Sequence, residues 1–298
     1  MATQARPRRA HFWPEWLLSN TLFRLLCAAL FVGAGFVVAQ LALNGLRAAG
    51  VLAGRTQLSL AAFALFVPLT YGAYRMYLAL AERRAPAELG GAGAARELGA
   101  GLAGGLALFA LVIGALWLIG AYRVVGTNGW AVLVAALASA SASAFVQELL
   151  FRGVLLRIAS ARLGAWPAIA LSLLLFGAAH LAGPGASALS TAGAMAAGLL
   201  FAGAFMCTGR LWLAIGLHAA WDFANDGVFG VAVAGMSGQP IPGLLRAELR
   251  GPDLLTGGAF GVEASAVAVA VVLLAALALL AQARRVALRQ DQLSGTGV

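Results

Sequence analysis

Residues 25–43 read LLCAALFVGAGFVVAQLAL, an apolar run without a charged side chain. A transmembrane helix needs about 20 such residues to cross the hydrocarbon core of a bilayer. The same character continues along the chain, because 62% of its 298 residues are hydrophobic and only 10% are charged. Soluble domains carry about 25% charged residues. The sequence therefore predicts an all-α integral membrane protein, folded as a polytopic bundle of transmembrane helices.

Further apolar runs bring the predicted number of spans to about eight. Glycine is frequent, with 38 residues, which suits helices that pack closely in lipid. The predicted spans are residues 24–44, 58–78, 100–122, 129–151, 165–182, 187–209, 211–228 and 263–283.

These spans divide the chain into five regions. We expect a basic cytoplasmic amino terminus at residues 1–23, followed by the first three spans within 24–128. A core of helices four to seven should occupy 129–228, and a Gly- and Pro-rich external loop 229–262. The last span and a cytoplasmic tail should occupy 263–298. A signal peptide also begins with basic residues, but the first apolar run is long enough to be retained as a span.

The distribution of arginine predicts the orientation in the membrane. All 20 basic residues are arginines, and they lie between the apolar runs rather than in one patch. With eight spans and the amino terminus inside, the arginines predicted outside are Arg47, Arg55, Arg123, Arg246 and Arg250. The other fifteen lie on the inner side, and an excess of arginine marks cytoplasmic loops. We therefore expect a multi-pass protein of the cell membrane with both termini cytoplasmic, lipid as a partner and no nucleic-acid partner. The absence of lysine indicates a GC-rich, bacterial genome.

A few ionisable residues lie inside the apolar segments. Glu148, His180, His218 and Asp222 do so, whereas most of the 11 acidic residues lie in predicted loops. Ionisable side chains are costly in a bilayer, so they face the bundle interior or a water-filled cavity and have partners there. These four residues are therefore the candidates for a functional site.

The spacing of these residues allows structural and functional interpretations. Glu148 and Arg152 are four residues apart and share a helix face, as a structural ion pair would. His218 and Asp222 have the same spacing, which suits an interhelical hydrogen bond, mutual orientation or metal binding. His180 alone is compatible with a packed, hydrogen-bonded histidine. Taken together on three helices, however, they supply what hydrolysis needs, a group that takes a proton from water and donors for an oxyanion.

Three motifs in register resemble those of the CPBP family, the CAAX proteases and bacteriocin-processing enzymes also called Abi proteins. That family carries Glu-Glu-x-x-x-Arg, then Phe-x-x-x-His, then His-x-x-x-Asn or Asp on successive membrane helices. This chain has QELLFR at residues 147–152, FGAAH at 176–180 and HAAWD at 218–222. The resemblance covers about residues 130–226 and implies an eight-span bundle with endopeptidase activity.

The resemblance also implies a role for each residue. In the family, the first glutamate and the first histidine activate water, and the second histidine with its partner stabilises the oxyanion. On this chain, His180 would contact the water, His218 and Asp222 would form the oxyanion side, and Glu148 would hold Arg152.

The chain departs from the family at Gln147, which replaces the first glutamate. An amide cannot accept a proton at neutral pH, so Gln147 cannot be the general base. Three outcomes stay open. Glu148 could take the role, although it lies about 100° further around the helix. His180 could act alone while Gln147 orients water, or the pocket could have lost its activity.

The sequence leaves the cofactor undecided. Members of the family are commonly described as metalloproteases, and His180, His218 and Glu148 are the candidate ligands for a divalent metal such as Zn. The same residues suit a metal-free, glutamate-dependent reaction, and the chain has no His-Glu-x-x-His motif.

The main functional hypothesis is an intramembrane endopeptidase that cuts a peptide or protein near the membrane, such as a bacteriocin-like precursor. The alternative is a catalytically impaired pseudoprotease that binds peptides as a membrane or immunity factor, for which Gln147 is the motivating feature. A proton-coupled transporter is a third hypothesis, because intramembrane Glu and His also build proton relays.

Overall fold

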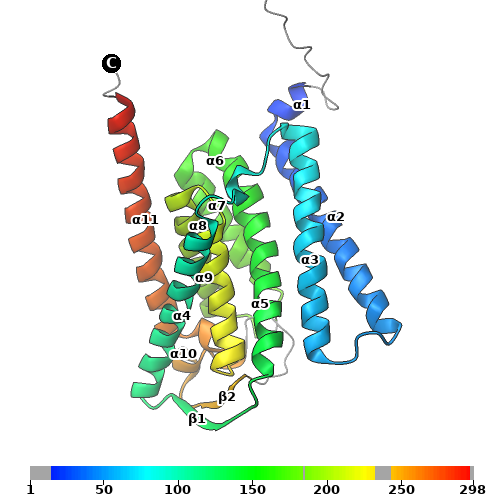
Figure 1. The fold of residues 1–298 in the computed structure, drawn as a ribbon. Helices are drawn as coiled ribbons and strands as arrows, with labels where there is room; N and C mark the ends of the chain where they lie inside the picture. The colour runs from blue at the N-terminus through cyan, green and yellow to red at the C-terminus, as the bar shows by residue number, and fades with distance from the viewer. Residues whose placement is uncertain (1–14, 184, 232–242, 296–298) are drawn as a thin grey trace, which may run out of the picture.

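The computed structural model describes residues 15–183, 185–231 and 243–295. Within these residues the predicted all-α helix bundle is confirmed (Figure 1). Three features predicted from sequence lie outside the described residues. They are the arginines of the amino terminus, the segment 232–242 of the external loop, and the last three residues of the tail.

Each of the eight predicted spans coincides with a helical segment. The main helices are α2 (Thr21–Ala48), α3 (Arg55–Tyr77), α4 (Ala94–Leu118), α5 (Val132–Glu148), α7 (Ala165–His180), α8 (Ala188–Thr208), α9 (Trp212–Asp222) and α11 (Ala266–Gly295). Within the described residues, six helices are long and apolar enough to cross a membrane by length and composition. The other two, α7 and α9, are shorter, and α9 continues as a π-helix, η4 (Phe223–Val228).

Short elements connect the main helices. They are α1 (Glu15–Ser19), the π-helices η1 (Leu78–Glu82) and η3 (Leu149–Leu156), the 3-10 turns η2 (Ala87–Leu89), η5 (Gly258–Phe260) and η6 (Val262–Ala264), and the helices α6 (Arg157–Leu163) and α10 (Asp253–Thr256). The π-helices η3 and η4 directly follow Glu148 and Asp222, two of the candidate site residues. Single-turn π segments inside α-helices are frequent at functional sites.

The helices that carry the candidate residues form the interior of the bundle. Within the apolar window of each span, half or more of the residues of α5 and α8 are buried, compared with 22% for α2 and α11. Helices α2 and α3 lie on one flank and α11 lies on the other (Figure 1). Lipid can cover these flanks, whereas the polar side chains of the interior must find protein or water partners.

Helix α9 is held close to α4 by glycines on both helices. A Cβ on Gly101 would lie 2.5 Å from the backbone oxygen of Leu213, and a Cβ on Gly216 would lie 2.5 Å from that of Leu98. Gly105 meets the backbone oxygen of Leu217 in the same way. Small residues let membrane helices approach until their backbones touch. This packing fixes the height and rotation of the helix that carries His218.

A two-stranded antiparallel sheet was not predicted from the sequence. Strand β1 (Tyr122–Thr127) follows α4 and pairs with β2 (Leu245–Leu249), with Tyr122 opposite Leu249. Helix α4 ends at Leu118, four residues before the end of the predicted span 100–122. Gly120 adopts a left-handed conformation with φ of 77° and turns the chain there. The pair of strands lies at the opposite end of the bundle from α1, α6 and the carboxyl-terminal end of α11 (Figure 1).

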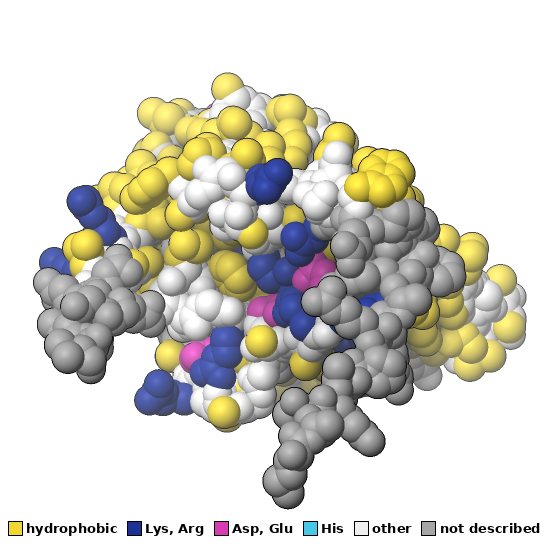
Figure 2. All heavy atoms as spheres, turned by 90° about the horizontal axis from the view of Figure 1, so that it is seen from above, with side chains coloured by type: hydrophobic (Ala, Val, Ile, Leu, Met, Phe, Trp, Pro, Cys, Tyr) yellow, Lys and Arg dark blue, Asp and Glu magenta, His cyan; other side chains and the backbone are white. Residues whose placement is uncertain are grey.

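The end of the bundle near α1 and α6 holds a network of ion pairs, here called the end network. Its members are Arg24, Glu82, Arg84, Glu88 and Arg157. Glu82 accepts from Arg24 at 2.9 Å, from Arg84 at 2.7 Å and from Arg157 at 2.9 Å. Figure 2 shows arginine and acidic side chains gathered on this end, with apolar side chains around them.

Glu88 is the acid of the end network that lies between spans. Its carboxylate accepts from Arg84 at 2.7 Å and from the hydroxyl of Tyr74. Burial by itself raises the pKa of Glu88, but the hydrogen bonds from Arg84 and Tyr74 outweigh it and hold the pKa below its ordinary value of 4.5. The ionised form therefore stabilises this end of the fold.

Candidate functional site

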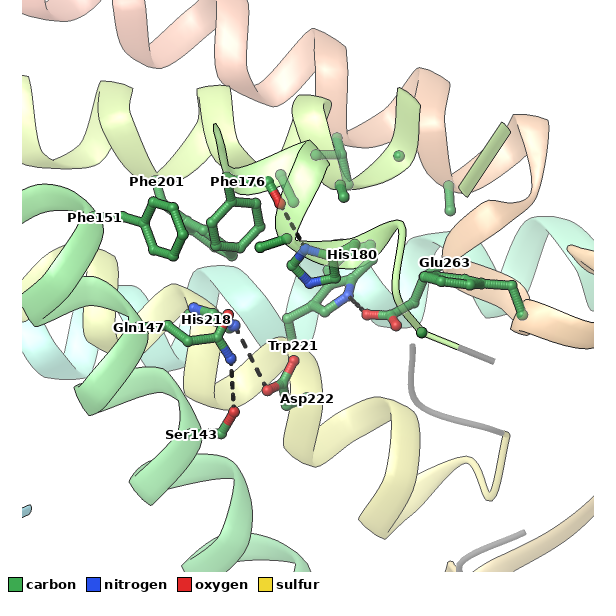
Figure 3. Close-up of a pocket in the computed structure, with 18 of the residues that line it drawn as sticks. Ser143, Gln147, Phe151, Phe176, His180, Phe201, His218, Trp221, Asp222 and Glu263 are labelled. Atoms are coloured by element: carbon green, nitrogen blue, oxygen red, sulfur yellow. Dashed lines mark hydrogen bonds and ion pairs between the residues drawn. The ribbon is translucent and has the colours of Figure 1, made fainter. Parts of the chain in front are cut away.

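A cavity of about 470 Å³ lies among α5, α7, α8, α9 and the start of α11. Four of its polar lining residues come from the family motifs and were predicted as site residues, and Figure 3 shows them around the same space. The polar residues that line it are Ser143, Gln147, His180, His218, Asp222 and Glu263. The aromatic residues of its wall are Phe151, Phe176, Phe201, Trp221 and Phe260. Three helices that are separate in sequence therefore bring their scarce polar groups to one pocket.

Behind the cavity lies a fully buried ion pair. Glu148 and Arg152 are both 0% exposed, and the Arg152 guanidinium donates to Glu148 Oε1 at 2.9 Å. Arg152 also donates to the backbone oxygen of Gly198 at 2.7 Å, which ties η3 to α8. The i, i+4 contact predicted from the sequence is present. Breaking such a pair would leave a buried charge uncompensated.

His218 joins this pair from the neighbouring helix α9. Its Nδ1 lies 2.8 Å from Glu148 Oε1, and its Nε2 lies 3.6 Å from Asp222 Oδ2. The contact with Glu148 spans 70 positions of sequence, so it could not be read from helix spacing. Glu148, Arg152 and His218 are here called the motif cluster. Because Glu148 holds Nδ1, the orientation of the imidazole is fixed, with the Nε2 edge toward Asp222.

Aromatic rings enclose the motif cluster. The imidazole of His218 stacks on Phe201, with ring centroids 4.5 Å apart and an interplanar angle of 11°. The guanidinium carbon of Arg152 lies 4.8 Å from the Phe176 ring centroid and 5.3 Å from that of Phe201. Cation–π contacts of this kind stabilise a charge that has left water. The phenylalanine of the Phe-x-x-x-His motif is therefore part of the packing around Arg152.

His180 stands on the other side of the cavity, at the end of α7. Its Nδ1 lies 2.7 Å from the backbone oxygen of Phe176, one turn earlier in the same helix. A carbonyl oxygen can only accept, so Nδ1 carries the proton and neutral His180 keeps a lone pair on Nε2. His180 is half-buried and lines the cavity. It can therefore accept a hydrogen bond from a water molecule there.

Gln147 also lines the cavity, from the last turn of α5. Its Nε2 donates to Ser143 Oγ at 2.8 Å, one turn earlier on the same face (Figure 3). The side chain thus takes the place of the family's first glutamate but offers an amide instead of a carboxylate. Gln147 can orient water by hydrogen bonding and cannot remove its proton.

Glu263 is a cavity residue that the sequence analysis missed. It lies in η6, just before α11, and its Oε1 accepts from the indole nitrogen of Trp221 at 2.5 Å. Figure 3 shows its carboxylate beside the cavity. The signal in the sequence is an isolated acid directly before the last apolar run. Without the fold, nothing in the sequence links that acid to α7 and α9.

The predicted metal ligands do not form a matching set of donors. Among the residues that the structure describes, no group of three or more His, Cys, Asp and Glu side chains is placed to hold a metal ion. His180 engages Phe176 through Nδ1, and His218 turns its Nδ1 to Glu148. Glu148 is not among the residues lining the cavity. As arranged in the described residues, these three side chains do not converge on one ion.

Comparison with known protein families identifies the segment that carries this site. The model of the family described as Type II CAAX prenyl endopeptidase Rce1-like matches residues 128–224, about a third of the chain. The matched segment includes the whole motif cluster together with His180 and Asp222, whereas Glu263 lies beyond it. No curated protein and no solved structure gave a match. The resemblance drawn from the three motifs is confirmed, and residues 128–224 of this membrane protein match the Rce1-like CAAX-protease family model.

Proposed function

We propose that this protein is an intramembrane endopeptidase that hydrolyses a peptide bond of a membrane-associated substrate. The observation that carries the proposal is the convergence of His180, His218 and Asp222 on one cavity, next to the buried Glu148–Arg152 pair. The family match supports the same reaction class. An endopeptidase needs this combination of a proton acceptor beside water and a fixed donor beside the carbonyl oxygen.

In the proposed reaction, His180 Nε2 accepts a hydrogen bond from a water molecule in the cavity and orients it. The water oxygen attacks the carbonyl carbon of the substrate, and negative charge develops on the carbonyl oxygen. His218 in its imidazolium form donates Nδ1–H to Glu148 and Nε2–H to this oxyanion, while Asp222 Oδ2 lies 3.6 Å from Nε2, beyond hydrogen-bonding distance. The C–N bond then breaks, and the leaving amine takes the proton that the water lost.

The substrate class follows from where the cavity lies. Its walls are formed by helices of an apolar bundle, so a peptide must approach from the membrane or its surface. The matched family is described by its action on prenylated CAAX substrates. For this chain we propose a membrane-associated peptide and leave the lipid group as a variable of the test.

The test is peptide cleavage by the purified protein in lipid nanodiscs. Internally quenched peptides with and without a farnesylated cysteine are compared for the wild type, His180→Ala and Glu248→Ala. Glu248 is an exposed residue of β2 and serves as the control. We expect cleavage of at least one peptide, a loss of about 10²- to 10⁴-fold in kcat/KM for His180→Ala, and no change for Glu248→Ala. Cleavage that persists at the wild-type rate in His180→Ala would contradict the proposed site.

A second candidate is a peptide-binding protein without hydrolytic activity, and Gln147 is the observation that favours it. If the wild type binds the quenched peptides without cleaving them and Gln147→Glu cleaves them, the chain is a disabled protease. If the wild type cleaves them, the second candidate is excluded.

A further inference from the structure

In the proposed reaction His180 accepts a hydrogen bond from the water and orients it, so a further group takes the proton. Gln147 cannot do so. Glu148 is fully buried, and one oxygen of its carboxylate already meets both Arg152 and His218. It does not line the cavity. The carboxylates that do line it, among the described residues, are Asp222 and Glu263.

These two carboxylates have different neighbours. Asp222 stands one turn after His218 on the same helix, with its Oδ2 3.6 Å from His218 Nε2. It therefore belongs to the oxyanion side of the cavity. Glu263 comes from a different part of the chain, the turn η6, and its Oε1 accepts from the indole N–H of Trp221. The two carboxylates that line the cavity thus lie on different elements, α9 and η6.

The backbone around Glu263 is fixed in place. Its neighbours Val262 and Ala264 are 0% and 1% exposed, so η6 is anchored in the core on both sides of the acid. A Cβ on Gly193 of α8 would lie 2.7 Å from the backbone oxygen of Glu263. Gly193 therefore allows η6 to lie directly against α8, beside the cavity.

The side chain of Glu263 is also held. Trp221 donates its indole N–H to Glu263 Oε1 at 2.5 Å, and the Trp221 ring packs edge-on against Phe109 with centroids 4.8 Å apart. Trp221 is buried and lies on α9 between His218 and Asp222 in sequence. The contact thus couples the position of Glu263 to the helix that carries the oxyanion side. Figure 3 shows Glu263, His180 and Asp222 around the same cavity.

We propose that Glu263 is the general base of this protein and replaces the carboxylate that the family carries at position 147. The inference rests on the proposed endopeptidase function. Glu263 takes the proton from the water that His180 orients, while the water oxygen forms its bond to the carbonyl carbon. Glu263 then passes that proton to the nitrogen of the leaving amine as the C–N bond breaks, and the carboxylate is regenerated.

With Glu263 as the base, the protein does not need an acid at position 147, where the family has one. A general base needs a carboxylate within reach of the water, and the fold can supply it from any element that borders the cavity. In this protein the proposed base lies on η6, outside the segment that the family model matches, whereas the family carries its base at the position of Gln147 on α5. A single carboxylate at either position should therefore be sufficient.

The experiment exchanges the carboxylate between the two positions. The kcat/KM for the best quenched peptide is measured in nanodiscs for the wild type, Glu263→Gln, Glu263→Gln with Gln147→Glu, and the matched control Glu248→Gln on β2. We expect a loss of about 10²- to 10⁴-fold for Glu263→Gln and no change for Glu248→Gln. The double variant should regain at least about tenfold. Thermal unfolding of each variant identifies any that fail to fold.

Each outcome separates the inference from the proposed function. Wild-type activity that Glu263→Gln retains overturns the role of Glu263 and leaves the endopeptidase function standing. A loss in Glu263→Gln that the second carboxylate does not restore, with a lowered unfolding temperature, assigns Glu263 a structural role and also overturns the inference. An inactive wild type with an active Gln147→Glu variant overturns both. Rescue by the double variant supports the inference, because a structural defect at position 263 would not be repaired from α5.

Discussion

The motif cluster and the end network both contain buried glutamates paired with arginines, yet their surroundings differ. In the end network, Glu82 accepts from three arginines, and Glu88 accepts from an arginine and a tyrosine. None of its described residues lines the cavity. In the motif cluster a single carboxylate, Glu148, meets one arginine and a histidine, and that histidine borders the cavity. Buried ion pairs are thus common to both regions, and what distinguishes the proposed reaction centre is an ion pair that orients a histidine beside a cavity.

The largest expected effect on stability comes from Arg152→Met. The substitution leaves Glu148 buried without its guanidinium partner, so we expect a loss of about 3–5 kcal/mol in the free energy of unfolding. The control is Arg250→Met, because Arg250 pairs with Glu248 on the surface, where their side chains are 58% and 49% exposed. Such exposed pairs contribute about 0–1 kcal/mol. Unfolding is followed in mixed micelles by tryptophan fluorescence.

The pair can be tested further by removing both charges. Arg152→Met combined with Glu148→Leu should recover much of the lost stability, because no buried charge is left unpaired. The double variant should still lack activity, since His218 has lost the group that orients it. Equal stabilities of Arg152→Met and Arg250→Met would contradict the difference between buried and exposed pairs.

The next expected effect comes from Gly105→Ala, which acts on the packing beneath the site. A Cβ at this position meets the backbone oxygen of Leu217, next to His218, so α9 must shift away from α4. Such overpacking costs about 1–3 kcal/mol, and the displaced histidine should lower kcat/KM as well. The control is Gly114→Ala on the same helix, where no neighbouring atom lies within 4 Å. That control should be neutral or stabilising, because alanine favours the helix.

Much of the architecture could be predicted from the apolar runs alone. All eight helical positions follow from them, because a bilayer requires long uninterrupted apolar segments. The local pairs Glu148–Arg152 and His218–Asp222 follow from the i, i+4 rule. The contact between Glu148 and His218, the sheet of β1 with β2, and the placement of Glu263 at the cavity could not be predicted. Each of them joins segments far apart in the chain, and a single sequence contains no periodic signal for such contacts.

The smallest expected effect is the pH dependence of the end network. The pKa of Glu88 lies below its ordinary value of 4.5, so its ionised form stabilises the fold above that pH. This contribution is lost as the pH falls through the lowered pKa. We therefore expect Glu88→Gln to cost about 1–3 kcal/mol at pH 7, and the difference from the wild type to shrink as the pH falls below 4.5. A difference that stays constant from pH 7 to pH 3 would contradict the role of the ionised carboxylate.

The most direct test of the two roles is a paired measurement of cleavage and unfolding on His180→Ala and Glu88→Gln in the same nanodiscs. The histidine is half-buried beside the cavity, and the glutamate is buried among arginines at the end of the bundle. The account predicts that His180→Ala loses at least about 10²-fold in kcat/KM with an unchanged unfolding temperature. It predicts that Glu88→Gln lowers the unfolding temperature and keeps the kcat/KM of the folded protein. If His180→Ala keeps its activity, or loses it only in proportion to the fraction that unfolds, the cavity is not the reaction centre.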